Sequence, residues 1–297
     1  MGRDEMFRYS LEQKIFDIKG IKVGGQPGEN PPVLIGSIFY HKHKIVEDEK
    51  KGVFRKDEAE KLIKNVEELS DKSKIPFMLD VVGSSPEAII KYVEFIANVT
   101  QAPLLVDPLG DVAVASVALR YVKEVGLTDR AIYNSLTAKS KDEEYKILQE
   151  NKIDKAVLLL YTDKILDVES RIKNLEIILS KTRQYSIDKF LVDTFVMDLP
   201  SLSAAMKTAI DVKKRYGLPV GCGAHNAVSA QRKAFKERFG IEWVKTMELI
   251  SNLAPIVIGS DFILYGPIEV SNEVFAAVYT IYSSYRYLKR FNLGIQL

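Results

Sequence analysis

Side chains that carry carboxylate or amide groups follow several apolar runs of this 297-residue chain. An ionised Asp accepts two parallel N–H bonds, and an Asn offers both a donor and an acceptor, so a ring of such residues could grip a heterocycle with adjacent donors and acceptors. A single Asp or Asn in such a place often only caps the next helix or holds a turn. The candidates are Asp80, Asp107, Asn134, Asp193, His225 and Asn226.

Asp80 is the weakest of these candidates, because Gly83-Ser84-Ser85 beside it is typical of a turn. His225 more often stabilises a loop than acts as an acid or base. Cys222 lies within an apolar run, which favours a buried, inert thiol. The sequence contains no CxxC, HExxH, phosphate-loop or GxSxG motif, so we expect no metal ligated by this chain.

The elements that must position these residues repeat as a short apolar run, a turn and an amphipathic helix. Near-continuous apolar strands indicate burial on both faces, as in a parallel sheet. The strands are expected at 33–39, 76–82, 103–107, 131–135, 155–161, 189–194, 218–223 and 262–265, with 256–258 as the alternative for the last. The helices are expected at 56–69, from 86 onward, and at 112–125, 141–150, 168–182, 201–216, 229–239, 242–253 and 273–290.

Eight such units without a break in composition predict a single α/β domain over 1–297, a (β/α)8 TIM barrel. An open, doubly wound sheet is the rival architecture, but no GxGxxG follows any strand. In a barrel the candidate residues would converge on one mouth, at the carboxyl ends of the strands. The first 32 or so residues are rich in turns and are expected to form a hairpin that covers the barrel floor.

Composition excludes several classes of protein. The net charge of +2 comes from interspersed charges, which does not indicate nucleic-acid binding. No apolar run approaches the roughly 18 residues that span a bilayer, and the charged first five residues do not resemble a secretory signal. One cysteine in 297 residues fits a reducing compartment, so we expect a cytoplasmic protein, with attachment to a membrane only through a partner.

Several motifs, over about residues 7–269, resemble the family of the H subunit of tetrahydromethanopterin S-methyltransferase. They are GGQPGE at 24–29, GSIFY at 36–40, HKIV at 43–46, RAIYNS at 130–135, LVDT at 191–194, GCGAHNA at 221–227 and FILYGPIE at 262–269, with a looser match for LDVVG at 79–83. The resemblance implies a pterin-binding TIM barrel. It also implies that Asp107, Asn134 and Asp193, with Asp80 as a weaker candidate, hold the pterin ring and that Asn226 lies near its methylated nitrogen.

The resemblance further implies an enzyme, a methyltransferase that moves a methyl group between N5 of tetrahydromethanopterin or tetrahydrofolate and the cobalt of a corrinoid. The corrinoid would be carried by a partner protein or by other components of a methyltransferase complex, and the chain itself would form a homodimer. Asn226 and Asp193 would be the catalytic residues, because a poor amine leaving group must gain positive character at N5 before its methyl departs.

Two alternatives remain open at this point. The first is a dihydropteroate-synthase-like pterin enzyme, which would need cations after the last two strands to bind pyrophosphate. The runs at 221–226 and 265–269 contain no Lys or Arg. The second is a non-catalytic pterin-binding or assembly subunit, which Pro108-Leu109-Gly110 motivates, because a small hydroxyl residue is expected directly after Asp107.

Overall fold

The computed structural model describes residues 7–290 and 295–296, with side chains over residues 8–286. The charged first residues, from which no secretory signal is expected, lie outside this part. Eight parallel strands close into a barrel in which the strand order follows the chain order. The predicted (β/α)8 TIM barrel is therefore confirmed. The strands are β4 (Val33–Ile38), β7 (Phe77–Val82), β8 (Leu104–Asp107), β9 (Ala131–Leu136), β10 (Lys155–Leu159), β11 (Lys189–Asp193), β12 (Val220–Cys222) and β13 (Phe262–Pro267).

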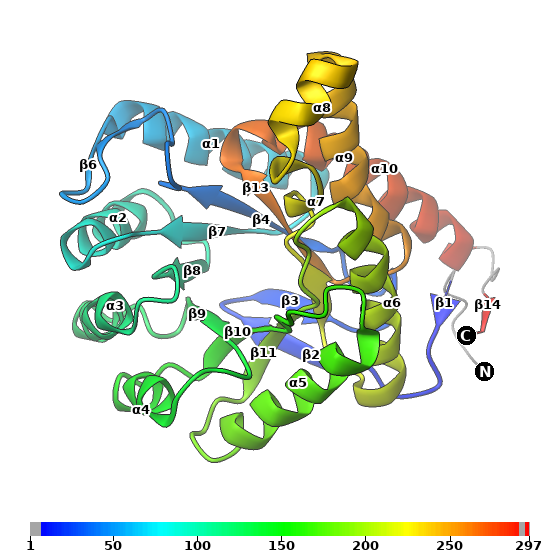
Figure 1. Ribbon diagram of the computed structural model, residues 1–297, viewed down its shortest axis with the longest axis horizontal. Coiled ribbons are helices and arrows are strands. Elements are labelled where there is room, and N and C mark those ends of the chain that lie inside the picture. Colours follow the sequence, from blue (N-terminus) through cyan, green and yellow to red (C-terminus); the bar gives the residue numbers. More distant parts are fainter. Residues whose placement is uncertain (1–6, 291–294, 297) are drawn as a thin grey trace.

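Helices surround the strands (Figure 1). Most of them begin and end within a few residues of the predicted positions. They are α1 (Lys56–Ser73), α2 (Pro86–Val99), α3 (Val112–Glu124), α4 (Asp142–Glu150), α5 (Val168–Thr182), α6 (Leu199–Tyr216), α7 (Asn226–Ser229), α8 (Arg232–Phe239), α9 (Ile241–Val257), the 3-10 turn η1 (Ile268–Val270) and α10 (Ser271–Arg290). The eighth strand is the preferred run at 262–265, whereas the alternative at 256–258 belongs to the end of α9.

Local chemistry explains where these helices begin and end. The Ser85 side chain accepts the Ala88 N–H, and Pro86 occupies the first turn of α2, where its missing N–H costs nothing. Asp198 and Ser201 form a reciprocal capping box at the start of α6, and Gly217 ends that helix at φ +61°. The segment at 229–239, expected as one helix, is divided instead into the short α7 and a separate α8, which projects from the barrel (Figure 1).

A hairpin of β2 (Ile15–Ile18) and β3 (Ile21–Gly24) packs against the inside of the barrel at its amino-terminal end. Ile18 and Val23 contact the innermost side chains there, so this end is closed. Short pairs are also formed by β5 (Val46–Asp48) with β6 (Val53–Phe54), and by β1 (Phe7–Arg8) with β14 (Ile295–Gln296), which brings the two ends of the chain side by side. No helix in the described ranges is both long and apolar enough to cross a bilayer.

Two apolar clusters make up the core. The larger one lies between the strands and the helices, and the smaller one fills the barrel. Because successive side chains of a strand point to opposite faces, the residues two positions beyond this inner cluster must face the interior again, nearer the mouth. The inner cluster contains Val33, Ile35, Met78, Leu105, Ile132, Val157, Leu191, Phe262 and Leu264.

Candidate functional site at the carboxyl ends of the strands

A polar layer follows the apolar one inside the barrel. Seven of the eight strands contribute to the inner cluster. On five of them, the residue two positions after a cluster member carries a hydroxyl, a carboxyl or an amide. Active sites of TIM barrels lie at this carboxyl-terminal face. The strand phase therefore directs five polar side chains into one interior level below the mouth, namely Ser37, Asp80, Asp107, Asn134 and Asp193.

Asp80 is the centre of one half of this layer. Its carboxyl accepts a hydrogen bond from the Ser37 hydroxyl (Oγ–Oδ2 2.8 Å) and another from the Asn134 amide (Nδ2–Oδ1 3.1 Å). Asp80 is 4% exposed. The Asp80 side chain points into the barrel from the middle of β7. Sequence reasoning missed Ser37, although it stands two residues after Ile35 and so has the interior phase.

Asp107 lies at the end of the neighbouring strand, β8. Its Oδ1 accepts the Leu109 N–H at 2.8 Å, in a turn where Leu109 takes φ +54°. Burial, and then the charge of Asp80, raise the pKa of the Asp107 carboxyl well above its usual value, while the Leu109 N–H opposes them. Asp80 has two side-chain donors and Asp107 has none, so the negative charge of this pair rests on Asp80 and the proton on Asp107.

Asp193 ends β11 on the other side of the barrel. Its carboxyl accepts the Phe195 N–H at 2.8 Å and a hydrogen bond from the Gly223 backbone. Burial raises the pKa of Asp193 to about 6, and these two backbone donors and the charge of Arg171 oppose that rise. At neutral pH most of the Asp193 carboxyl is therefore ionised and able to accept hydrogen bonds from a ligand.

Asn226 is the first residue of α7, directly after the loop that leaves β12. A Cβ atom on Gly223 would lie 3.2 Å from Nδ2 of Asn226 and 3.9 Å from Oδ2 of Asp193. The amide and the carboxyl thus border the same small space, which the missing side chain of Gly223 leaves open. The structure accordingly groups the predicted residues into two sets, Asp80 with Asp107 and Asn134, and Asp193 with Asn226.

Two neighbours of Asn226 have structural roles. His225 is half-buried, and its Nδ1 lies 3.0 Å from the Leu264 carbonyl, which matches the expected loop-stabilising role. Burial lowers the pKa of His225, so the ring is neutral at pH 7. Cys222 is 1% exposed, and burial, followed by the charge of Asp193, raises the pKa of its thiol far above the usual value. A thiol that remains protonated is a poor nucleophile.

A cluster of polar side chains that the sequence analysis did not select lies after β4 and β13. The Glu269 carboxyl oxygen Oε1 accepts the Tyr40 hydroxyl at 3.0 Å and lies 3.0 Å from Nε2 of the buried His43. Nδ1 of His43 accepts the Phe39 N–H at 3.0 Å, which leaves the ring proton on Nε2, facing Glu269. Burial opposes the charge, but the His43 and Tyr40 donors prevail and lower the pKa of Glu269.

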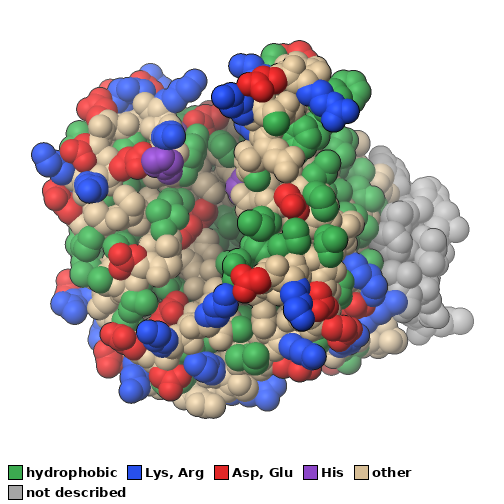
Figure 2. Space-filling model, in the orientation of Figure 1, with side chains coloured by type: hydrophobic (Ala, Val, Ile, Leu, Met, Phe, Trp, Pro, Cys, Tyr) green, Lys and Arg blue, Asp and Glu red, His purple; other side chains and the backbone are tan. Residues whose placement is uncertain are grey.

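The mouth of the barrel is hollowed in the space-filling view, between the α8 projection and the part of the molecule that carries α1 to α4 (Figure 2). Within the described part of the chain, no three His, Cys, Asp or Glu side chains gather as a metal site would require. The groups that reach this level are hydrogen-bonding ones, so the site is suited to a flat polar molecule with N–H donors.

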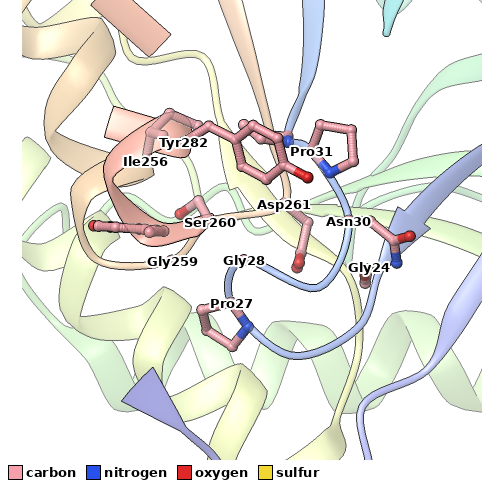
Figure 3. A pocket seen from close by; sticks show the side chains of 12 residues that line it. Gly24, Pro27, Gly28, Asn30, Pro31, Ile256, Gly259, Ser260, Asp261 and Tyr282 are labelled. Atoms are coloured by element: carbon pink, nitrogen blue, oxygen red, sulfur yellow. Dashed lines mark hydrogen bonds between the residues drawn. The ribbon is translucent and has the colours of Figure 1, made fainter. Parts of the chain in front are cut away.

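A second, small cavity lies at the opposite end of the barrel and has a different character (Figure 3). The loop at 24–32 and the turn at 259–261 line it, and its 20 Å³ hold about one water molecule. Beside it, the buried Asp261 carboxyl accepts hydrogen bonds from Nζ of Lys213 at 2.8 and 2.9 Å and from the Val220 N–H at 2.9 Å. These bonds help to fasten the floor to the barrel.

Solved structures with the same fold include dihydropteroate synthases. The enzyme from Xanthomonas albilineans superposes with a TM-score of 0.60 at 15% identity, covering 92% of this chain and 98% of that one. The enzyme from Vibrio fischeri gives 0.61 at 13% identity, covering 91% and 98%. At such identities the likeness concerns the fold, and it agrees with the closed barrel described above.

Relatives in sequence are much closer. The H subunit of tetrahydromethanopterin S-methyltransferase from Methanothermobacter thermautotrophicus is 41% identical over 284 residues, which cover 92% of this chain and 91% of the relative. The protein of the same name from Methanopyrus kandleri is 38% identical over 294 residues, with 92% and 91% covered. The family model described as the tetrahydromethanopterin S-methyltransferase MtrH subunit matches residues 11–297. The chain therefore belongs to the MtrH family of tetrahydromethanopterin S-methyltransferase subunits.

Proposed function

We propose that this chain is a methyltransferase that moves a methyl group between N5 of a tetrahydropterin and the cobalt of a corrinoid carried by a partner protein. The observation that carries the proposal is the polar interior layer of an MtrH-family barrel, where Asp107, Asn134 and Asp193 come from three different strands and Asn226 follows a fourth. Because the relatives are named for tetrahydromethanopterin, that pterin is the preferred substrate, and tetrahydrofolate is the alternative.

The pterin ring would be held by its edge. Pterins carry an amino group and ring N–H groups side by side, and a carboxylate accepts two such parallel donors. Asp193 is largely ionised at neutral pH and serves as one acceptor. Asp107 becomes the other when N–H donors replace its proton, and Asn134, held by Asp80, offers its free carbonyl oxygen.

The chemistry required of the chain is a proton or a hydrogen bond at N5. When the methyl leaves the pterin, the C–N5 bond breaks, its electron pair stays on nitrogen, and a proton must reach N5 to neutralise it. Asn226 is the donor nearest to the open space beside Gly223, either directly or through a water that it orders. Asp193, hydrogen-bonded to the same loop, fixes the ring against this donor, and orientation then supplies much of the acceleration.

A corrinoid would supply the cobalt that accepts or donates the methyl group, and this chain would contribute no ligand to it. The partner is proposed to be a corrinoid-binding protein or another component of a methyltransferase complex, docked over the mouth. A homodimer, a cytoplasmic location and attachment to a membrane only through such a complex are further parts of this proposal. The family description, which refers to one subunit of a methyltransferase, supports the existence of partners.

The test combines binding with turnover. Calorimetric titration with methyl-tetrahydromethanopterin and with methyl-tetrahydrofolate should detect binding of at least one, and free cob(I)alamin should then accept the methyl group. Asp107→Ala and Asp193→Ala should each weaken pterin binding by about 10-fold or more, since each removes charge-assisted hydrogen bonds. Binding without transfer would favour the non-catalytic pterin-binding subunit. Unchanged pterin binding in both variants would contradict the assignment of Asp107 and Asp193 to the pterin site.

A further inference from the structure

Arg171 is the largest side chain of the described residues that is fully buried, and it has no partner carboxylate. It extends from the first turn of α5 and is 0% exposed. Among residues 8–286, no Asp or Glu forms an ion pair with it. Its hydrogen bonds go to backbone carbonyls instead, and its Nε has no acceptor. A guanidinium remains charged even when burial lowers its pKa, so a full positive charge is held inside the protein.

The carbonyls that Arg171 binds belong to the residues directly after Asp193. One terminal nitrogen donates to the Thr194 carbonyl and, at 2.5 Å, to that of Phe195, and the other donates at 2.5 Å to the carbonyl of Ile165. The guanidinium also lies 5.6 Å from the centre of the Phe195 ring. Arg171 therefore holds the turn between β11 and α6 from the side of α5.

That turn needs such support because of its backbone. Phe195 has φ +65°, a conformation that an aromatic residue adopts only when its surroundings enforce it. In this conformation the Phe195 N–H points to Oδ1 of Asp193 at 2.8 Å, while its carbonyl faces Arg171. One residue thus connects the buried cation to the carboxyl that faces the mouth.

We infer that Arg171 is a positioning residue, which holds the Thr194–Phe195 turn and places its charge behind Asp193 so that this carboxylate is ready to accept the pterin. The identity of the ligand, a pterin, rests on the proposed function. The effect of Arg171 on the ionisation of Asp193 does not. The effect of the charge on Asp193 agrees in direction, because Arg171 lowers the pKa of that carboxyl and opposes the rise caused by burial.

The other groups around Asp193 cannot replace this charge. Cys222 on β12 holds a thiol that stays protonated. Asn226 on α7 is neutral, and so is His225, which also lies beside Gly223. Backbone N–H groups of Phe195 and Gly223 are the remaining donors. Arg171 is the one cation that contributes to the pKa of Asp193 in the described part of the chain.

The experiment compares Arg171→Met with Arg130→Met. Arg130 is also a buried arginine, 2% exposed, and it donates to the carbonyls of Thr100, Ala102 and Ala97 at the opposite end of the barrel. It is therefore a control for losing a buried guanidinium that binds only backbone. Arg171→Lys, which keeps the charge, is the conservative variant.

The first readout is the pKa of Asp193 in the ligand-free protein, from the carboxyl signals of ¹³C-labelled aspartate, assigned with Asp193→Asn. In Arg171→Met this pKa should rise from about 6 to about 7 or above. In Arg171→Lys the pKa of Asp193 should lie close to the wild-type value, and in Arg130→Met it should be unchanged. An unchanged pKa in folded Arg171→Met, or an equal change in Arg130→Met, overturns the inference.

The second readout is the pH dependence of tetrahydropterin affinity. Arg171→Met should lose about threefold or more in affinity near pH 6.5 and much less near pH 8, because the deficit comes from protonation of Asp193. If Arg171→Met does not fold, Arg171→Gln takes its place, because it keeps hydrogen-bond donors without the charge. Its pterin affinity should also weaken at a higher pH than in the wild type as the pH falls. An unchanged pH dependence in Arg171→Gln overturns the inference. A wild-type protein that binds no pterin contradicts the proposed function alone and leaves the first readout intact.

Discussion

The Asn134 amide donates a hydrogen bond to the Asp80 carboxyl across 3.1 Å, and with the Ser37 hydroxyl it satisfies a charge buried inside the barrel. This contact explains why two neighbouring carboxyls differ. Asp80 can remain ionised with two side-chain donors, whereas Asp107, which faces that charge and has only the Leu109 N–H, holds its proton. A like charge nearby always disfavours the second ionisation.

Pterin binding should therefore release protons. In the free protein the raised pKa of Asp107 favours its protonated form, and N–H donors from the ring would lower that pKa and favour the carboxylate. Binding should release up to about one proton and should tighten as the pH rises. Calorimetric titrations in buffers of different ionisation enthalpy measure this number directly. Asp107→Asn should abolish the release, and a release that persists in this variant would locate the proton elsewhere.

Asn226→Ala should separate chemistry from binding. The amide is proposed to act on N5 as the methyl departs, so its loss removes an interaction that matters most in the transition state. We expect transfer to free cob(I)alamin to slow by about 100-fold, with the pterin Kd changed by less than about fivefold. Single-turnover kinetics at saturating pterin measure the first quantity and calorimetry the second. A variant that loses affinity and rate in equal proportion would make Asn226 a binding residue only.

Gly223→Ala should impair turnover without unfolding the protein. Gly223 does not need a left-handed backbone, and its added Cβ would meet Nδ2 of Asn226 at 3.2 Å, so the amide must shift by a few tenths of an ångström. Since small misplacements at a reacting centre are costly, a loss of about 10-fold in kcat is expected. Gly126→Ala is the control: its φ is +73° and no atom crowds it, so stability should fall by about 1 kcal/mol while kcat is kept.

Much of this arrangement was predictable from the sequence, because it depends on local patterns. Strand periodicity alone sends Asp107, Asn134 and Asp193 to one level of the barrel, and the same period of two would have selected Ser37 from its place after Ile35. Arg171 also had a signal, since it shares one face of α5 with the buried Leu175 and Ile178.

What the sequence could not predict depends on contacts between distant segments. Nothing in its residue type marks Phe195 for φ +65°, because the surrounding structure imposes that conformation. The meeting of Tyr40 and His43 with Glu269 likewise joins residues more than 220 positions apart, which only closure of the barrel brings together. The position of Asn226 in a separate short helix follows from the loop after β12 in the same way.

The buried pair at the barrel floor gives a prediction about stability and pH. Lys213 and Asp261 are 1% and 8% exposed, and Lys213→Met would leave the Asp261 carboxyl with the Val220 N–H as its remaining donor. Removing one partner of a buried pair destabilises the fold by about 3–5 kcal/mol at neutral pH. Lys207→Met, which loses an ion pair between an exposed lysine in the middle of α6 and Asp211, is the control and should cost less than about 1 kcal/mol.

The sign of the pH dependence distinguishes this account from a simple packing defect. Burial already raises the pKa of Asp261, and losing Lys213, which lowers it, must raise it further. Folded Lys213→Met would then bind a proton that the unfolded chain does not, so its stability deficit should be smallest at acidic pH and grow as the pH rises through the folded pKa. Urea unfolding at pH 5 and pH 8 measures the difference. A deficit equal at both values, as expected for Lys213→Met combined with Asp261→Asn, would mean that the lost contacts of the lysine stem, and not an unpaired carboxylate, destabilise the floor.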